Sequence, residues 1–215
     1  MNRRSSSYWV VCFTLIAILP SWAHAAEPAS GPAPAGKGAT SGEVRVLVVY
    51  YSRTGNTEKF AQGVAEGVKR VNGAAAVVKR VEDATKEDLE AADAIALGCP
   101  TYFGNVPGKM KIVIDDWNWK WKVDFTDKVG GAFSTGAGQT GGKEFTVVSL
   151  LMFMLNNRMV VAGPLYQDAE GEDIWAEAGA AAMTGPLDPG VGPAELEQAG
   201  RLGKRLAQLA KKLKR

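Results

Sequence analysis

The chain has 215 residues, of which 46% are hydrophobic and 22% are charged, and its formal net charge is +2. This composition is typical of one globular domain, and the moderate charge content argues against a disordered chain. The small net charge also excludes a strongly basic nucleic-acid-binding protein as the default interpretation, so no nucleic-acid partner is expected.

Residues 1–25 have the order of a secretory signal peptide. Two arginines near the start precede a largely apolar run over residues 8–19, and Ala23-His24-Ala25 supplies the small residues that a signal peptidase reads. The run is too short to span a bilayer comfortably, although an uncleaved anchor is the alternative. We therefore expect cleavage after Ala25 and a periplasmic or secreted protein.

Cleavage at this point would limit the available chemistry. It would remove His24, which is the only histidine, and Cys12, which leaves Cys99 as the only cysteine. A Ser-His-Asp triad, a Cys-His pair, a histidine-ligated metal and an intramolecular disulfide are then excluded, and no metal is expected. The chemistry must come from the backbone, from hydroxyl and carboxylate groups, or from a bound cofactor.

Residues 26–42 are rich in Ala, Pro, Gly and Ser and lack apolar periodicity, which predicts a flexible linker before a domain over residues 43–215. In that domain, short apolar runs alternate with segments of helical periodicity. Strands are predicted at 44–50, 76–81, 93–98, 129–134 and 159–163, and helices at 58–71, 86–91, 109–116, 145–155 and 193–213. This alternation is typical of an α/β fold with a parallel sheet, whose strand-to-helix loops bind ligands.

The loop after the first predicted strand has the composition of a phosphate site. Small hydroxyl and amide side chains surround a glycine, so that backbone N–H groups and hydroxyls can converge on one anion, and the following helix N-terminus adds its dipole. The residues of this first loop are Ser52, Arg53, Thr54, Gly55, Asn56 and Thr57. An ordinary capped helix start is the alternative interpretation.

The loop after the third predicted strand offers aromatic and small-backbone walls for a flat heteroaromatic ring. The residues of this second loop are Pro100, Thr101, Tyr102, Phe103, Gly104 and Asn105. An ordinary turn with Pro and Gly is the alternative. Cys99, at the end of the preceding buried strand, is predicted to pack rather than to react.

The loop after the fourth predicted strand is rich in glycine and is expected to pack beside the same ring. The residues of this third loop are Ser134, Thr135, Gly136, Ala137, Gly138, Gly141 and Gly142. Residues 136–141 match G-x-G-x-x-G, but the match follows the fourth strand and has no acidic residue about twenty positions further on. A dinucleotide fingerprint is therefore not predicted.

These three loops resemble those of the flavodoxin family. Residues 51–57 are similar to its FMN-phosphate loop, and residues 98–105 resemble the flavin-ring loop of its NAD(P)H:quinone oxidoreductase branch, the WrbA-like (tryptophan-repressor-binding-protein-like) flavoproteins. Residues 134–136 and 141–144 are similar to the third loop of that branch. The resemblance implies a flavodoxin-like three-layer sandwich with a five-stranded parallel sheet in the order 2-1-3-4-5, for which flavodoxin is the standard example, and FMN at the edge of strands one and three.

The resemblance also implies a function, namely the two-electron reduction of quinone-like acceptors with NAD(P)H or another donor. A flavodoxin-like one-electron transfer protein is the alternative, and a flavin-free phosphate-binding module is a third possibility. Because the flavin carries the chemistry, no catalytic side chain is expected. Trp121 and Tyr102 are expected to face the substrate, and Asn156, which stands where the family has histidine, is expected to reach the flavin through its amide.

Charge near the flavin ring separates the two electron-transfer functions. Residues 100–109 and 134–143 contain no acidic side chain, and each segment ends in lysine. Positive charge stabilises the anionic, fully reduced flavin and so favours transfer of two electrons over one.

The sequence is compatible with more than one electron donor and with more than one oligomeric state. Export would place the protein where nicotinamide nucleotides are scarce, so a redox partner protein or the membrane quinone pool is an alternative electron donor. The family insertion that supports tetramers is absent between Val81 and Asp93, which leaves the oligomeric state undecided. The C-terminal helix is expected to pack through a leucine stripe with a solvated basic face, and a dock for an acidic partner or an anionic membrane is the alternative.

Overall fold

The computed structural model describes residues 42–167, 170–185 and 190–214. The predicted signal peptide, and all of the predicted linker except its last residue, lie outside the described residues. Within the described ranges, no helix is both long enough and apolar enough to cross a membrane.

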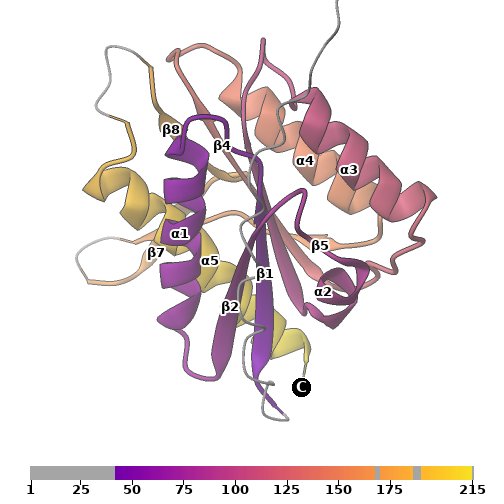
Figure 1. Ribbon diagram of the computed structural model, residues 1–215. Coiled ribbons are helices and arrows are strands. Elements are labelled where there is room, and N and C mark those ends of the chain that lie inside the picture. The colour runs from indigo at the N-terminus through magenta and orange to yellow at the C-terminus, as the bar shows by residue number, and fades with distance from the viewer. Residues whose placement is uncertain (1–41, 168–169, 186–189, 215) are drawn as a thin grey trace, which may run out of the picture. The chain divides into compact units, whose positions relative to one another are not determined.

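A parallel sheet forms the middle layer of the fold (Figure 1). Its main strands are β1 (Val44–Tyr50), β2 (Ala74–Arg80), β3 (Ala94–Pro100), β4 (Val129–Gly136) and β5 (Val160–Val161). They lie in the order β2-β1-β3-β4-β5, which confirms the predicted order. The central strands β1, β3 and β4 are almost entirely buried, because helices cover both faces of the sheet.

The helices of the described ranges form the two outer layers. The helix α1 (Asn56–Lys69) and the helix α5 (Pro193–Leu213) pack on one face of the sheet, and α2 (Lys86–Ala91), α3 (Gly108–Trp119) and α4 (Lys143–Asn156) pack on the other. The strands serve both layers because successive side chains point to opposite faces of the sheet. In β1, for example, the side chains at positions 46 and 48 belong to the first core and those at 47 and 49 to the second.

The sheet edge beyond β4 differs from the single fifth strand that the sequence predicted. The strand β5 pairs only with the beginning of β4, whereas a further strand, β8 (Ala180–Met183), pairs with the end of β4 and makes the sheet six-stranded. An antiparallel hairpin of β6 (Leu165–Gln167) and β7 (Asp173–Ala176) lies between β5 and β8 in the chain. The strand β8 is not predicted from the sequence, because its three alanines lack the β-branched and aromatic character that predicts strands.

The C-terminal helix packs as its leucine stripe predicts. Leu202 and Leu206 are completely buried in the core between α5 and the sheet. Part of the basic face is tied to the rest of the domain, because Lys214 forms an ion pair with Asp93 at 2.8 Å and Lys211 donates a hydrogen bond to the carbonyl oxygen of Asn72 at 2.7 Å. These contacts anchor the end of α5 at the amino-terminal edge of the sheet.

The helices α1 and α5 approach each other closely through glycine. A Cβ atom at Gly67 would lie 1.9 Å from the backbone oxygen of Gly200, and one at Gly203 would lie 1.9 Å from the backbone oxygen of Val64. Only a residue without Cβ permits this approach. Because α1 begins at the end of the first loop, its packing against α5 also fixes the position of that loop.

We predict that Gly67→Ala lowers the free energy of unfolding by about 1–3 kcal/mol, because the added methyl group forces two backbones apart. Gly108→Ala is the matched control, since a Cβ atom at this helical position meets nothing within 4 Å and should leave stability unchanged or slightly higher. Denaturant unfolding of the flavin-free protein measures both variants. Equal effects of the two substitutions would contradict the account of α1 and α5 packing.

Candidate functional site

The three predicted loops meet at one edge of the sheet. The strands β1, β3 and β4 are parallel neighbours, so the residues that follow their carboxyl ends gather at the same edge. Backbone hydrogen bonds join the loops there: the N–H of Tyr51 donates to the carbonyl of Gly98 at 2.9 Å, and the N–H of Thr101 donates to the carbonyl of Thr135 at 2.7 Å. The structure thus brings together three segments that are widely separated in the sequence.

The first loop leaves the beginning of α1 available to an anion. Gly55 adopts the left-handed conformation, with a φ of 90°, and its N–H donates to the hydroxyl oxygen of Ser52 at 3.1 Å. No described side chain caps α1. Among the described residues, no side chain occupies the first-turn N–H groups at the positive end of the helix dipole, which favours the phosphate site over the ordinary capped helix start.

The side chains of the first loop divide into an exposed group and a buried group. Arg53 and Thr54 are exposed, so both can reach a ligand above the loop. The hydroxyl of Thr57 is buried and lies 2.7 Å from the hydroxyl of Thr135, which ties the first loop to the third. Thr57 therefore contributes its backbone N–H toward the ligand and its side chain toward the scaffold.

A second pair of hydroxyl groups ties the second loop to the third. Thr146, on the inner side of α4, donates to the hydroxyl of Thr101 at 2.7 Å. The Thr101 hydroxyl in turn donates to the carbonyl of Gly142 at 3.3 Å. The loops are thus held in position by their own polar contacts.

The second loop forms a tight turn that carries its aromatic residues. Tyr102 and Asn105 exchange two backbone hydrogen bonds of 2.9 and 3.1 Å, and both intervening residues, Phe103 and Gly104, have positive φ. The Phe103 side chain is fully exposed, although a bulky residue rarely adopts this conformation. A phenylalanine held in a strained conformation and left in solvent indicates a ligand-binding turn.

Tyr102 is partly buried against the core, unlike the exposed Phe103 beside it. Its ring packs edge-on against Tyr51, with ring centroids 6.4 Å apart. Its hydroxyl is buried and has no hydrogen-bond partner in the described part of the chain, and burial raises its pKa. A buried hydroxyl without a partner lacks a hydrogen bond that a bound ligand can supply.

The third loop is closed by a lysine whose role the sequence did not reveal. Lys143 is buried, and its ammonium group donates to the carbonyl oxygens of Gly138 at 2.7 Å and Gln139 at 3.3 Å. Gly136 leaves room for this arrangement, because a Cβ atom there would lie 2.9 Å from the Lys143 side chain. Positive charge is therefore fixed within the third loop.

Two residues predicted for the site lie elsewhere. Asn156 is the last residue of α4, and the helix starts with Lys143 at the third loop. Because an α-helix rises about 1.5 Å per residue, Asn156 lies about 20 Å from that loop. Trp121 follows the end of α3, which starts beside the second loop, and its side chain packs against the core at that far end. Within one chain, both residues therefore lie far from the three loops.

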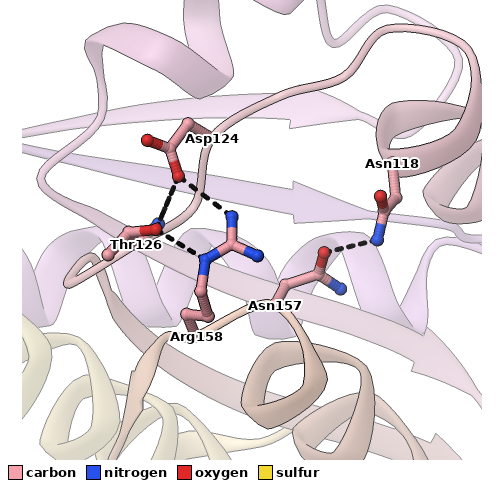
Figure 2. A network of polar contacts seen from close by, with 5 residues as sticks. All are labelled: Asn118, Asp124, Thr126, Asn157 and Arg158. Atoms are coloured by element: carbon pink, nitrogen blue, oxygen red, sulfur yellow. Dashed lines mark hydrogen bonds and ion pairs between the residues drawn. The ribbon is translucent and has the colours of Figure 1, made fainter.

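A separate polar network occupies that far end of α3 and α4 (Figure 2). Asn118 donates to Asn157 at 2.6 Å, and Arg158 donates to Thr126 at 2.7 Å and to Asp124 at 3.2 Å. Hydrogen bonds from Thr126, together with the Arg158 guanidinium, lower the pKa of Asp124 to about 2. This network joins the segment before β4 to the end of α4 and has no contact with the three loops.

The described part of the site supplies no reactive thiol and no metal ligand set. Burial raises the pKa of Cys99 to about 12, so its thiol stays protonated and packs as a small apolar group, as predicted. Across the described ranges, no three His, Cys, Asp or Glu side chains lie close enough to hold a metal ion.

These features fit FMN, which combines a phosphate monoester with a flat aromatic ring. The uncapped start of α1 suits the phosphate, and the exposed Phe103 and the unpaired Tyr102 hydroxyl suit the ring. The binding residues would be those of the three loops.

Known proteins are similar to this chain in sequence and in fold. A family model described as NADPH-dependent FMN reductase matches residues 72–172. A flavodoxin from Aquifex aeolicus is 38% identical over 164 residues, which cover 76% of this chain and 85% of that protein. An NAD(P)H dehydrogenase (quinone) from Geobacter metallireducens is 34% identical over 203 residues, which cover 80% of this chain and 100% of that protein.

Among solved structures, the WrbA-like flavodoxin from Agrobacterium tumefaciens is similar to this chain, with a TM-score of 0.61 and 26% identity. The match covers 79% of this chain and 99% of that one. The chain therefore belongs to the flavodoxin-like family of FMN-dependent oxidoreductases, which includes the NAD(P)H dehydrogenases (quinone).

Proposed function

We propose that the protein transfers two electrons from NAD(P)H or another donor to a quinone-like acceptor through FMN. The observation that carries the proposal is the uncapped start of α1 beside the strained, exposed turn of the second loop. The flavin, when bound, supplies the electron-transfer chemistry, and the protein supplies binding, orientation and electrostatics. No catalytic side chain is required.

The residues of the chain have distinct roles in this proposal. The N–H groups of the first turn of α1 and the hydroxyl of Thr54 bind the phosphate. Tyr102 and Phe103 hold the ring, and the exposed side chain of Phe103 can also contact a flat acceptor. The third loop packs along the ring because Lys143 holds it closed.

The charges around the loops support transfer of two electrons rather than one. The ammonium group of Lys143 is bound to carbonyl oxygens, and within the described part of the chain no carboxylate forms an ion pair with it. Asp115 and Asp116 on α3 are neutralised by Lys111 at 2.6 Å and Lys120 at 2.7 Å. Fully reduced FMN is an anion and is stabilised by the remaining positive charge.

A flavodoxin-like electron carrier is the second candidate function, because one of the similar proteins is named a flavodoxin. Export to the periplasm or beyond is also part of the proposal, and it rests on the signal-peptide pattern of residues 1–25. In an exported protein, a redox partner protein or the membrane quinone pool would take the place of NAD(P)H as donor.

We predict that Thr54→Ala weakens FMN binding by about 1–3 kcal/mol, or roughly 5- to 150-fold, because a charge-assisted hydrogen bond to the phosphate is lost. Thr57→Ala should weaken FMN binding by a similar amount, because it removes the hydrogen bond to the Thr135 hydroxyl that joins the first loop to the third. Quenching of FMN fluorescence on titration with flavin-free protein measures the affinity. Thr126→Ala, at the opposite sheet edge, is the control and should bind FMN like the parent; unchanged affinity in both loop variants would refute the phosphate assignment.

We also predict that, in the absence of oxygen, the FMN-loaded protein oxidises NADH or NADPH through repeated turnovers only when a quinone is present to reoxidise the flavin. Stepwise anaerobic reduction should convert the oxidised absorbance spectrum directly into the fully reduced spectrum, because positive charge draws the second electron onto the flavin. Flavin-free protein is the control for both assays. Absence of quinone turnover, combined with a large population of one-electron-reduced flavin, would instead support the electron carrier.

A further inference from the structure

A groove lies between the C-terminal half of α5, the end of α1 and the β6–β7 hairpin, on the α1 and α5 side of the sheet (Figure 1). Its volume is about 600 Å³, which is within the range of cavities that bind small molecules. The described residues that line it include six basic side chains and two acidic ones. The basic residues are Arg70, Arg201, Lys204, Arg205, Lys211 and Lys212, and the acidic residues are Asp173 and Glu197. Because the formal net charge of the whole chain is only +2, positive charge is concentrated in this α5 groove.

The two carboxylates of the α5 groove already have partners. Glu197 forms an ion pair with Arg70 at 2.9 Å and lies 3.7 Å from the guanidinium of Arg201. Asp173 accepts a hydrogen bond from a glutamine amide of β6 at 3.1 Å. The hairpin turn carries further acidic residues at positions 170 and 172, which are not among the residues that line the groove. Glu197 thus compensates two of the six cations.

The other four cations of the α5 groove have no such compensation. Within the described part of the chain, no carboxylate forms an ion pair with Lys204, Arg205, Lys211 or Lys212, and Lys211 instead donates to the carbonyl oxygen of Asn72 at 2.7 Å. They form two pairs of adjacent residues that are seven positions apart, so the pairs lie on the same face of α5, about 10 Å from each other. Like charges gathered in one groove repel one another, and a bound anion relieves that repulsion.

We propose that the α5 groove binds a free oligophosphate, which is a small anion with several linked phosphate groups. Lys204 and Arg205 bind one end of this anion, and Lys211 and Lys212 bind the other. An arginine guanidinium can donate two parallel hydrogen bonds to one phosphate, and a lysine ammonium group supplies a compact positive charge. A single phosphate reaches only one of the two pairs, so a ligand with several phosphates is favoured. The proposal is independent of the flavin and of the reaction it supports.

The α5 groove is separate from the site formed by the three loops. The first loop precedes the start of α1, whereas Arg70 and Val71, which line the groove, follow the end of that helix. The helix has 14 residues, so about 20 Å separates its two ends. An anion in the groove therefore does not compete with FMN for the first loop, and the two can bind at the same time.

The shape and charge of the α5 groove favour a small anion over a macromolecule. A stable protein partner covers about 800 Å² of surface. Beside the groove, however, positive charge is already compensated, because Lys69 pairs with Glu66 at 2.6 Å and Lys214 pairs with Asp93 at 2.8 Å. A lipid surface binds helices that expose apolar side chains beside their cations, whereas the two apolar side chains that line this groove are half-buried.

Isothermal titration calorimetry with sodium tripolyphosphate tests the proposal. The full-length protein is titrated in the presence of saturating FMN, so that the first loop is already occupied. The parent protein should bind one tripolyphosphate, and Lys204→Gln/Lys212→Gln should raise the dissociation constant at least about 10-fold, because each pair loses a cation. Lys120→Gln/Lys122→Gln is the matched control, since it removes the same charge from two exposed lysines at the end of α3. This control should bind tripolyphosphate like the parent.

Other anions distinguish the possible occupants of the α5 groove. Orthophosphate should bind more weakly than tripolyphosphate, because it reaches only one pair of cations. Absence of tripolyphosphate binding by the parent, or an equal loss of affinity in the two double variants, would overturn the proposal. A hexaglutamate peptide that binds more tightly than tripolyphosphate would assign the groove to an acidic protein partner and would also overturn it. The same holds if tripolyphosphate does not bind but phosphatidylglycerol vesicles bind the parent and not Lys204→Gln/Lys212→Gln, since the occupant is then a membrane.

Discussion

The arrangement of the molecule depends on one constraint: parallel neighbouring strands all end at the same edge of their sheet. The strands β1, β3 and β4 are paired in register along their length, so the loops that follow them cannot avoid one another. Two hydroxyl pairs, one buried and one partly buried, then fix the loops relative to each other. The first loop is also fixed through α1, because α1 follows this loop and packs against α5 through glycine.

The sequence predicted the elements whose local residue pattern matches their place in the folded structure. The β-branched run of β1 and the hydroxyl-rich loop after it have a single consistent interpretation, because a buried strand needs the first and an anion site needs the second. Similarly, Cys99 follows an apolar run, and its burial was predicted from that run alone. The strand order came from the resemblance of the loops to those of a known family.

The remaining features depend on distances that a sequence does not contain. Asn156 and Trp121 were assigned to the site by alignment, but each stands at the end of a helix that leaves the site at its first turn. The alanine-rich β8 forms a strand because β4 offers it a free edge, which is a tertiary effect. The sequence indicated that Lys143 places a positive charge near the ring. Its hydrogen bonds to the carbonyl oxygens of two loop residues could not be predicted, because they form only when the loop folds back over the lysine.

Binding of FMN depends on a phosphate held at the uncapped start of α1 and on a ring held by the second loop. Comparing the affinities of FMN and riboflavin for the flavin-free protein tests this directly, because the two ligands share the ring and differ in the phosphate. If the phosphate is bound by the first-turn N–H groups and the first loop, FMN should bind at least about 100-fold more tightly than riboflavin. Equal affinities, or no binding of either ligand, would contradict the account.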